Sequence, residues 1–153
     1  MSLHGSINHV SITVSDLESA ISFFGPLLEF LGYAVGAVST YKGDRLTVNV
    51  NESNGIAINI WEARTSHEFD VYEPGLHHLA LNAGSREQVD EVHRLVVGLG
   101  AEILDGPGEF PFAHGGYYAV YFLGPDGMKF EIVYMPELDG QGNNRRVRTN
   151  RFA

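Results

Sequence analysis

The stretch His9-Val10-Ser11-Ile12 recurs later in the chain as His78-Leu79-Ala80-Leu81. In each copy a histidine begins a run in which apolar and polar side chains alternate, the pattern of a strand with one buried face. Each run leads into the Ser-x-x-Glu/Gln pattern of a helix start, at residues 15–18 and 85–88. The sequence therefore predicts an internal duplication that places one histidine at the same position of each half.

The two predicted helices also end alike. An apolar stripe at helical spacing stops at a Leu-Gly pair in both halves, Leu31-Gly32 and Leu99-Gly100. A glycine just after the last helical residue is a common C-terminal stop. We expect Ser15 and Glu18 to form a capping box at the start of the first helix, and Gly25-Pro26 to break or kink that helix midway.

After each helix the hydrophobic period changes to two, which predicts three strands in each half. The predicted strands are 33–39, 45–51 and 55–62 in the first half and 101–104, 117–123 and 128–135 in the second, with a turn at Pro125-Asp126-Gly127. Each half is thus a βαβββ module, and the fold class is α+β. Either half alone is too small and one-sided to be stable, so we expect one globular domain. Its expected parts are a first module at 1–64, a linker at 65–75, a second module at 76–136 and a C-terminal tail at 137–153.

Strand alternation indicates which side chains share a face. The apolar residues of the first predicted strand should face a helix, and His9 points to the other side. The same reasoning, applied to every predicted strand, puts four polar residues on helix-free faces: His9, Asn59, His78 and Glu131. His77 has the opposite parity from His78, so we expect it to contact the helix or the strand end.

Two imidazoles and one carboxylate form a ligand set suited to Fe(II), Mn(II) or another divalent ion with open coordination positions. If the two sheets curve around a shared cavity, His9, His78 and Glu131 can converge on such an ion beside Asn59. For any one of these residues alone, an ordinary half-buried polar side chain is the alternative. The repeat symmetry and the shared parity of the whole set favour a metal site.

A further histidine, His114, lies in a glycine-containing loop before a predicted strand. A loop histidine near a cavity can act as an acid–base group or a proton shuttle. An exposed loop residue without such a role is the alternative.

The composition narrows the class of protein. The 153 residues carry a net charge of −9, which disfavours nucleic-acid partners. The chain has no cysteine, which excludes disulfides, thiolate nucleophiles and Cys-ligated metal sites. No apolar run is long enough to span a bilayer, and nothing resembles a secretory leader, so we expect a cytoplasmic protein without a membrane partner.

Three segments carry a resemblance to a known superfamily: Ile7-Asn8-His9-Val10-Ser11-Ile12, Leu76-His77-His78-Leu79-Ala80-Leu81 and Phe122-Leu123-Gly124-Pro125-Asp126-Gly127-Met128-Lys129-Phe130-Glu131. They are similar to segments of the vicinal oxygen chelate superfamily. It includes glyoxalase I, extradiol dioxygenases, fosfomycin-resistance transferases, methylmalonyl-CoA epimerase and bleomycin-binding proteins. The resemblance covers roughly residues 6 to 136. It implies two tandem βαβββ modules that form a curved mixed sheet around a cup-shaped metal site, with His9, His78 and Glu131 as ligands.

The resemblance also bears on the reaction. The position at which glyoxalase I carries a glutamate ligand falls on Asn59, which argues against glyoxalase I activity. The epimerase carries an amide there, but residues 45–51 supply no carboxylate to act as its base. The remaining implication is a metal-dependent enzyme, dioxygenase-like or lyase/isomerase-like, that chelates two adjacent oxygens of a small substrate. The divalent ion could be Fe, Mn, Ni or Zn. The alternative is a non-catalytic protein of the bleomycin-resistance type that binds and sequesters a small molecule.

Roles for other residues follow from the same resemblance. Candidate proton-handling partners are His114, Tyr117, Tyr118 and Tyr121, of which we expect His114, Tyr118 and Tyr121 to be catalytic. The expected substrate-binding residues are Asn49, Asn59, Trp61 and Phe112. A homodimer is expected as well, and whether it exchanges modules between chains stays open.

Overall fold

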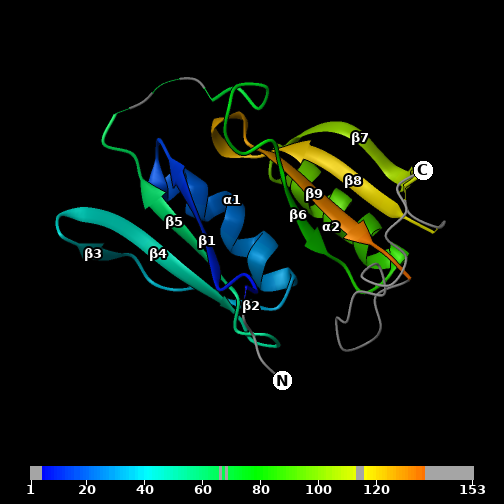
Figure 1. Cartoon of the computed structure of the whole chain (residues 1–153), viewed down its shortest axis with the longest axis horizontal. Helices are drawn as coiled ribbons and strands as arrows, with labels where there is room; N and C mark the ends of the chain where they lie inside the picture. Colours follow the sequence, from blue (N-terminus) through cyan, green and yellow to red (C-terminus); the bar gives the residue numbers. More distant parts are fainter. Residues whose placement is uncertain (1–4, 66, 68, 113–115, 137–153) are drawn as a thin grey trace.

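The computed structural model of the protein describes residues 5–65, 67, 69–112 and 116–136. Two sheets lie side by side in Figure 1, with strand orders β1-β5-β4-β2 and β6-β9-β8-β7, and β3 pairs with β4. The first module consists of β1 (His9–Val14), α1 (Leu17–Phe30), β2 (Tyr33–Ala34), β3 (Ser39–Tyr41), β4 (Asp44–Asn51) and β5 (Ala57–Glu62). The second consists of β6 (Leu79–Asn82), α2 (Arg86–Gly98), β7 (Glu102–Glu109), β8 (Tyr118–Leu123), the 3₁₀ turn η1 (Pro125–Gly127) and β9 (Lys129–Tyr134).

The two modules repeat one topology. The strand before each helix pairs in parallel with the last strand of its module, β1 with β5 and β6 with β9, and the other pairings are antiparallel. Parallel neighbours need a crossover connection, which α1 and α2 provide together with the strands that follow them. The predicted α+β class with two βαβββ modules is therefore confirmed. Of the predicted strand at 33–39, only β2 and the first residue of β3 are strand, and residues 35–38 between them are not.

The start of α1 differs from the expected capping box. The N-cap is Asp16, whose carboxylate accepts a hydrogen bond from the Ser19 amide at 2.8 Å. Ser15 instead donates its amide (2.8 Å) and its hydroxyl to Asp126, in the turn between β8 and β9. A contact between distant parts of the chain thus decides which residue caps the helix, and it ties the first module to the second.

Of the expected break or kink at Gly25-Pro26, the break does not occur, because α1 runs from Leu17 to Phe30 through Pro26. A proline inside a helix costs about 3 kcal/mol or more through the lost hydrogen bond and the ring clash. The apolar side chains on either side of it, Phe23, Phe24, Leu27 and Leu28, are all buried. Their packing offsets the cost of the proline.

The predicted features of the other helix ends are confirmed. At the start of α2, the Ser85 hydroxyl accepts from the Gln88 amide at 3.1 Å, and the Gln88 side chain accepts from the Gly84 amide. Gly32 and Gly100, just past the helix ends, have φ of +85° and +88°. Glycine adopts this left-handed conformation at little cost, which explains the stop at each Leu-Gly pair.

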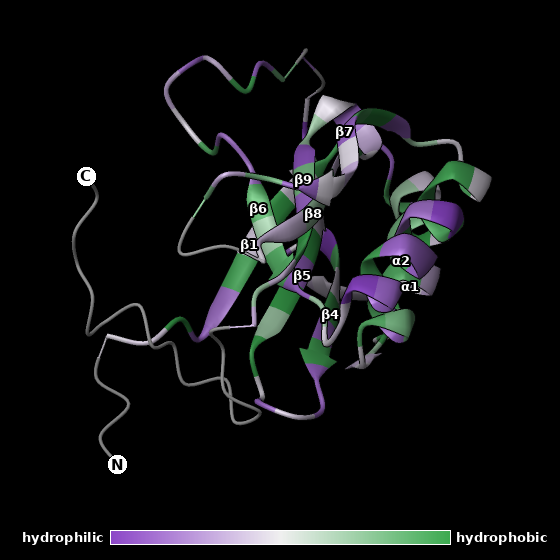
Figure 2. Ribbon diagram, turned by 90° about the vertical axis from the view of Figure 1, so that its right-hand side faces the viewer, coloured by the Kyte–Doolittle hydropathy of each residue, from purple (hydrophilic) through white to green (hydrophobic). Residues whose placement is uncertain are grey.

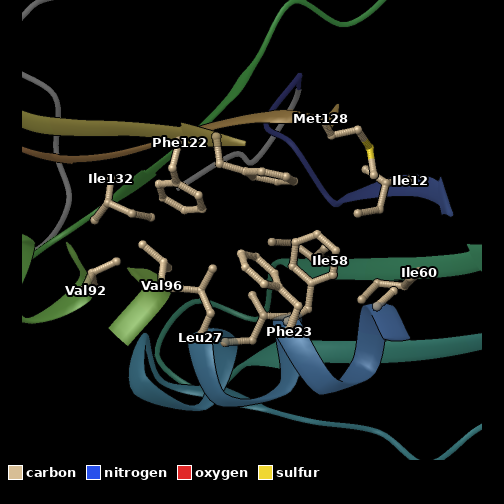
Figure 3. Packing of buried hydrophobic residues seen from close by; sticks show 14 of the residues in the cluster. Ile12, Phe23, Leu27, Ile58, Ile60, Val92, Val96, Phe122, Met128 and Ile132 are labelled. Carbon is tan, nitrogen blue, oxygen red and sulfur yellow. The ribbon is translucent and has the colours of Figure 1, made fainter. Parts of the chain in front are cut away.

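One hydrophobic core joins the modules. Figure 2 shows both helices on the same side of the strands, and the apolar faces of both sheets pack with the helices in a single cluster (Figure 3). Two aromatic pairs cross between the modules: Phe24 of α1 lies 5.3 Å from Phe130 of β9, and Phe23 lies 6.3 Å from Phe122 of β8, ring centre to ring centre. Each module therefore buries its apolar face partly against the other.

The helix-free faces of the two sheets differ. On the first sheet Val48 and Val50 are 41% and 38% exposed, and Ser11 and Thr13 are exposed as well. On the second sheet a small cluster is buried: Tyr117, Ala119, Val133 and Met135. Neither helix of the described part of the chain is long and apolar enough to cross a membrane.

Two adjacent valines of α2 test the shared core. Val96 is fully buried and Val97 is 49% exposed. We expect Val96→Ala to lower the free energy of unfolding by about 2 kcal/mol, through lost burial and the cavity left behind. Val97→Ala deletes the same two methyl groups and should be neutral or slightly stabilising, because alanine favours helix. Urea denaturation measures both, and equal losses would contradict the packing described here.

Candidate metal centre

The glutamate predicted as a metal ligand, Glu131, lies at the centre of a hydrogen-bonded group on the helix-free face of the second sheet. Its side chain is 2% exposed. The carboxylate Oε2 lies 3.2 Å from Nε2 of His78. Oε1 accepts hydrogen bonds from the Tyr121 hydroxyl, at 2.9 Å, and from the Tyr117 hydroxyl. A buried carboxylate is costly unless its oxygens are bonded, and these three side chains supply the partners.

The strand registers explain why these groups meet. Tyr121 of β8 is the antiparallel partner of Glu131 in β9. Ala80 of β6 is the parallel partner of Glu131 on the other side. His78 lies two residues before Ala80, and Figure 1 shows β6, β9 and β8 as neighbours in one sheet. Alternation then puts His78, Glu131 and Tyr121 on one face, as strand parity predicts for the first two.

The environment of Tyr121 determines what its hydroxyl can do. Burial, and the hydrogen bond to the Glu131 carboxylate, raise the pKa of Tyr121 far above its usual range. The phenol therefore stays protonated at physiological pH. Tyr121 can donate a hydrogen bond to a bound group, but it is not poised to act as a base.

The other ring nitrogen of His78 also has a partner, which the parity argument missed. Nδ1 of His78 lies 2.7 Å from Nδ1 of His77, and the two rings meet edge to face at 5.0 Å. The parity argument predicts that His77 contacts the helix or the strand end, and it does not include this contact with His78. His77 lies two residues before Leu79, where β6 begins, so strand alternation alone does not determine what its side chain contacts. The His-His doublet itself was the available sequence signal.

Aromatic side chains and one ammonium group surround the cluster. Phe110 stacks on Phe112 at 5.9 Å, and each meets a tyrosine edge to face: Phe110 meets Tyr121 and Phe112 meets Tyr117. Phe112 is 50% exposed, so the group reaches the surface there. Nζ of Lys129 lies 5.3 Å from the centre of the Tyr121 ring. Phe112, predicted to bind substrate, is thus brought beside the glutamate cluster.

On the first module, His9 and Asn59 lie on the helix-free face of the parallel β1–β5 pair. His9 is exposed, and its Nδ1 lies 2.8 Å from Oδ1 of Asn8. Asn59 donates to Oγ of Ser11 at 3.3 Å, whereas its Oδ1 is buried and has no hydrogen-bond partner within the described structure. Among the residues that the structure describes, no three His, Asp or Glu side chains are grouped so that they could hold a metal ion. His78 and Glu131 are brought together in one chain, and His9 is not grouped with them.

The His78–Glu131 pair by itself fits a divalent ion. Two ligand atoms about 2.1 Å from a shared ion, at right angles, are about 3 Å apart. The Nε2–Oε2 separation of 3.2 Å is close to that value. An imidazole and a carboxylate are ligands that Zn, Mn, Fe and Ni all accept. The residues present therefore supply two ligands of such a site.

Two residues predicted for the site lie elsewhere. Tyr118 is on the helix side of β8 and donates to Asp90 of α2 at 2.7 Å. Asn49 is 1% exposed, donates to the Ile58 carbonyl at 2.9 Å and accepts from the Gly36 amide at 3.2 Å. Alternation explains both, because each residue is adjacent in its strand to one that faces the other way. Neither residue is part of the Glu131 cluster.

Trp61, also predicted to bind substrate, is not part of the Glu131 cluster. Trp61 lines an open cavity of about 670 Å³ between the first sheet and the segment that follows β5. The same cavity is bordered by Thr13, Arg64, Phe69 and Leu76. His114 falls outside the described residues.

Comparison with known proteins identifies the family to which this arrangement belongs. A family model for the Glyoxalase/Bleomycin resistance protein/Dioxygenase superfamily matches residues 6–132. The chain belongs to this superfamily. The match spans both βαβββ modules and includes His9, His78 and Glu131.

Individual proteins are similar to this chain over most of their length. An uncharacterized protein of Bacillus subtilis (strain 168), YqjT, is 32% identical over 132 residues, which cover 83% of this chain and 97% of that protein. The crystal structure of a putative glyoxalase from Bacillus halodurans is 31% identical, with a TM-score of 0.69, and the match covers 87% of this chain and 98% of that one. A fosfomycin resistance protein from Listeria monocytogenes shares the fold at 22% identity, with a TM-score of 0.62 and coverage of 86% and 93%.

Two tyrosines of β8 test the bonding of Glu131. Tyr121→Phe deletes a hydroxyl that bonds a buried carboxylate, and we expect it to lower the free energy of unfolding by about 1–3 kcal/mol. Tyr118→Phe also deletes a phenol hydroxyl, but this hydroxyl bonds Asp90, which is less buried than Glu131. We expect this variant to lower the free energy of unfolding by about 1 kcal/mol or less. Urea denaturation measures the two variants. A larger loss for Tyr118→Phe would contradict the assignment of Glu131 as the buried centre.

Proposed function

We propose that this protein is a metal-dependent enzyme that binds a small substrate through two adjacent oxygens. The observation that carries the proposal is the 3.2 Å approach of His78 Nε2 to Oε2 of a carboxylate that is 2% exposed. Members of this superfamily generally use divalent metal ions and bind small-molecule substrates. The proposed ligands are His78, Glu131 and His9.

The third ligand comes from a second copy of the chain in this proposal. His78 and Glu131 both belong to the second module, and the described residues of one chain hold no three-ligand group. His9 belongs to the first module, on a sheet face that leaves Val48 and Val50 exposed. In a twofold dimer, that face of one chain would meet the Glu131 cluster of the other, and two equivalent sites would form. Superfamily members often form dimers, which agrees with this arrangement.

The residues around the site define how a substrate would be held. A divalent ion bound there supplies a Lewis acid that stabilises negative charge on the chelated oxygens. The Tyr121 hydroxyl is a hydrogen-bond donor next to the proposed ligands, and the ammonium group of Lys129 adds one positive charge. Phe110 and Phe112 provide an apolar wall that is partly exposed. These features suit a planar oxygenated compound whose reaction passes through an enolate or a catecholate.

The reaction classes that fit are a dioxygenation and a lyase or isomerase reaction. Asn59 argues against the glyoxalase I reaction, because an amide cannot serve as the base. Its neighbour across the parallel pair is Ser11, to which it already donates a hydrogen bond. A base for an isomerase would therefore have to come from a group other than Asn59.

Metal titration tests the proposal. Metal-free protein titrated with Fe(II), Mn(II), Ni(II) and Zn(II) in a calorimeter should bind at least one of them in the micromolar range or tighter. His78→Ala and Glu131→Gln should each weaken that binding at least tenfold, because each removes a ligand. His93→Ala, which removes a histidine of α2 that contacts neither residue, is the matched control and should leave the affinity unchanged. The enzyme proposal fails if no ion binds in wild type.

A mixed dimer tests whether the ligands come from two chains. His9→Ala and Glu131→Gln each damage both sites of a homodimer. In a mixed dimer, the chain with His9→Ala still has His78 and Glu131, and the chain with Glu131→Gln still has His9. If His9 acts across the interface, these three residues form one complete site. We therefore expect about one ion per mixed dimer in the calorimeter, against two for wild type. If all three ligands come from one chain, the mixed dimer has no complete site and binds no ion at wild-type affinity.

One observation favours a second candidate function. In the structure, both oxygens of the Glu131 carboxylate already have partners, which are His78, Tyr117 and Tyr121. The carboxylate therefore needs no ion to compensate its burial. A protein of the bleomycin-resistance type would use the same cup to bind a small molecule without catalysis. That function predicts tight binding of an aromatic ligand by protein treated with a chelator. Loss of all ligand binding after chelation would exclude it.

A further inference from the structure

The hydrogen-bond chain through His78 continues to His77, and it has a direction. Nε2 of His78 faces Oε2 of Glu131 at 3.2 Å, and Nδ1 faces Nδ1 of His77 at 2.7 Å. Two imidazole nitrogens can bond only if one of them carries hydrogen and the other presents a lone pair. The protonation of Nε2 in His78 therefore determines which histidine donates.

Without an ion, the carboxylate sets the direction. An ionised carboxylate only accepts hydrogen bonds, so Nε2 of His78 carries hydrogen and donates to Glu131. In a neutral ring Nδ1 is then bare and accepts. Nδ1 of His77 must supply that hydrogen, so the bond runs from His77 to His78.

With an ion on His78, the direction changes. A histidine binds a metal through a bare nitrogen, so Nε2 gives up its hydrogen and the neutral ring carries it on Nδ1. Nδ1 of His78 then donates, and Nδ1 of His77 must accept. His77 is exposed, so its own hydrogen can exchange through water to its Nε2. Each ring holds one hydrogen before and after, so the two hydrogens are conserved.

We propose that His77 is the positioning residue for His78, and that the hydrogen bond between them reverses direction when an ion binds. This inference rests on the proposed function, because it takes His78 as a metal ligand. Metal-ligating histidines usually donate their second N–H to a carboxylate, a backbone carbonyl or water. Here that place is taken by a second imidazole, which can accept or donate as required. A carboxylate or carbonyl could hold only the ion-bound form.

The surroundings of His77 suit this role. The exposed ring of Tyr72 meets the His77 ring edge to face at 5.4 Å, and the His78 ring meets Tyr121 in the same way at 6.2 Å. The four rings therefore form a row from the surface to the buried carboxylate. These contacts fix the ring planes without using the ring nitrogens of His77.

Nitrogen NMR tests the reversal directly. The ¹⁵N shifts of an imidazole distinguish the ring nitrogen that carries hydrogen from the bare one, without reference to activity. The spectra are compared for metal-free and Zn(II)-loaded protein at a pH of about 8, where histidine is ordinarily neutral. In metal-free protein we expect His77 to carry hydrogen on Nδ1 and His78 on Nε2, and in loaded protein the opposite for both. An unchanged His77 tautomer on loading would overturn the proposal.

Variants of His77 test its effect on the ion. His77→Phe keeps a ring of similar shape but offers no nitrogen, and should weaken Zn(II) binding by about 10–100-fold, the usual effect of losing a partner of a ligating histidine. His77→Gln, whose amide oxygen can accept from Nδ1, should restore part of that loss. Tyr72→Phe keeps the edge contact and serves as the matched control, with wild-type affinity.

The possible failures are distinguishable. If His78→Ala abolishes Zn(II) binding and His77→Phe leaves it unchanged, with no change in melting temperature, the His77 proposal fails and the metal site stands. If wild-type protein binds no ion at all, the proposed function fails together with the reversal.

Discussion

Each sheet of this protein has one apolar face, and a single core buries both apolar faces. Phe23 and Phe24 of α1 reach across to Phe122 and Phe130 of the second sheet, so neither module covers its apolar face alone. Because the helices and the apolar faces are committed to that core, the polar cluster around Glu131 lies on the helix-free face. The location of the candidate chemistry is thus a consequence of hydrophobic burial.

The two helix-free faces have diverged although their topology is the same. On the second sheet, Glu131 is buried and bonded by His78, Tyr117 and Tyr121. On the first sheet, the equivalent strands are β4 and β5. They carry the exposed Val48 and Val50 and, at the position equivalent to Glu131, Asn59. One face is an assembled polar site with an aromatic wall, and the other is an open surface. This difference supports the proposal that the site is shared between two copies of the chain.

Much of the fold could be predicted from the sequence because strand alternation and helix stops are local signals. The meeting of His78 with Glu131 follows from parity and the repeat, and Tyr121 was expected with them. Tyr118 has the opposite parity from Tyr121, so alternation separates the two, and Tyr118 bonds Asp90 on the helix side. The buried bonds of Asn49 to Gly36 and Ile58 depend on contacts distant in sequence. The contact of His77 with His78 does not follow from parity, because β6 begins only at Leu79 and an element boundary is not fixed by periodicity.

The hydrogen bonds from Ser15 to Asp126 have an evolutionary consequence. Asp126 has a left-handed backbone, with φ of 60°, in the tight turn that joins β8 to β9. That turn sets the register in which Tyr121 faces Glu131. A substitution at Ser15, in the first copy of the duplicated unit, therefore acts on the alignment of a carboxylate in the second. The two copies cannot accumulate mutations independently, and the effects of changes in one should depend on the residues present in the other.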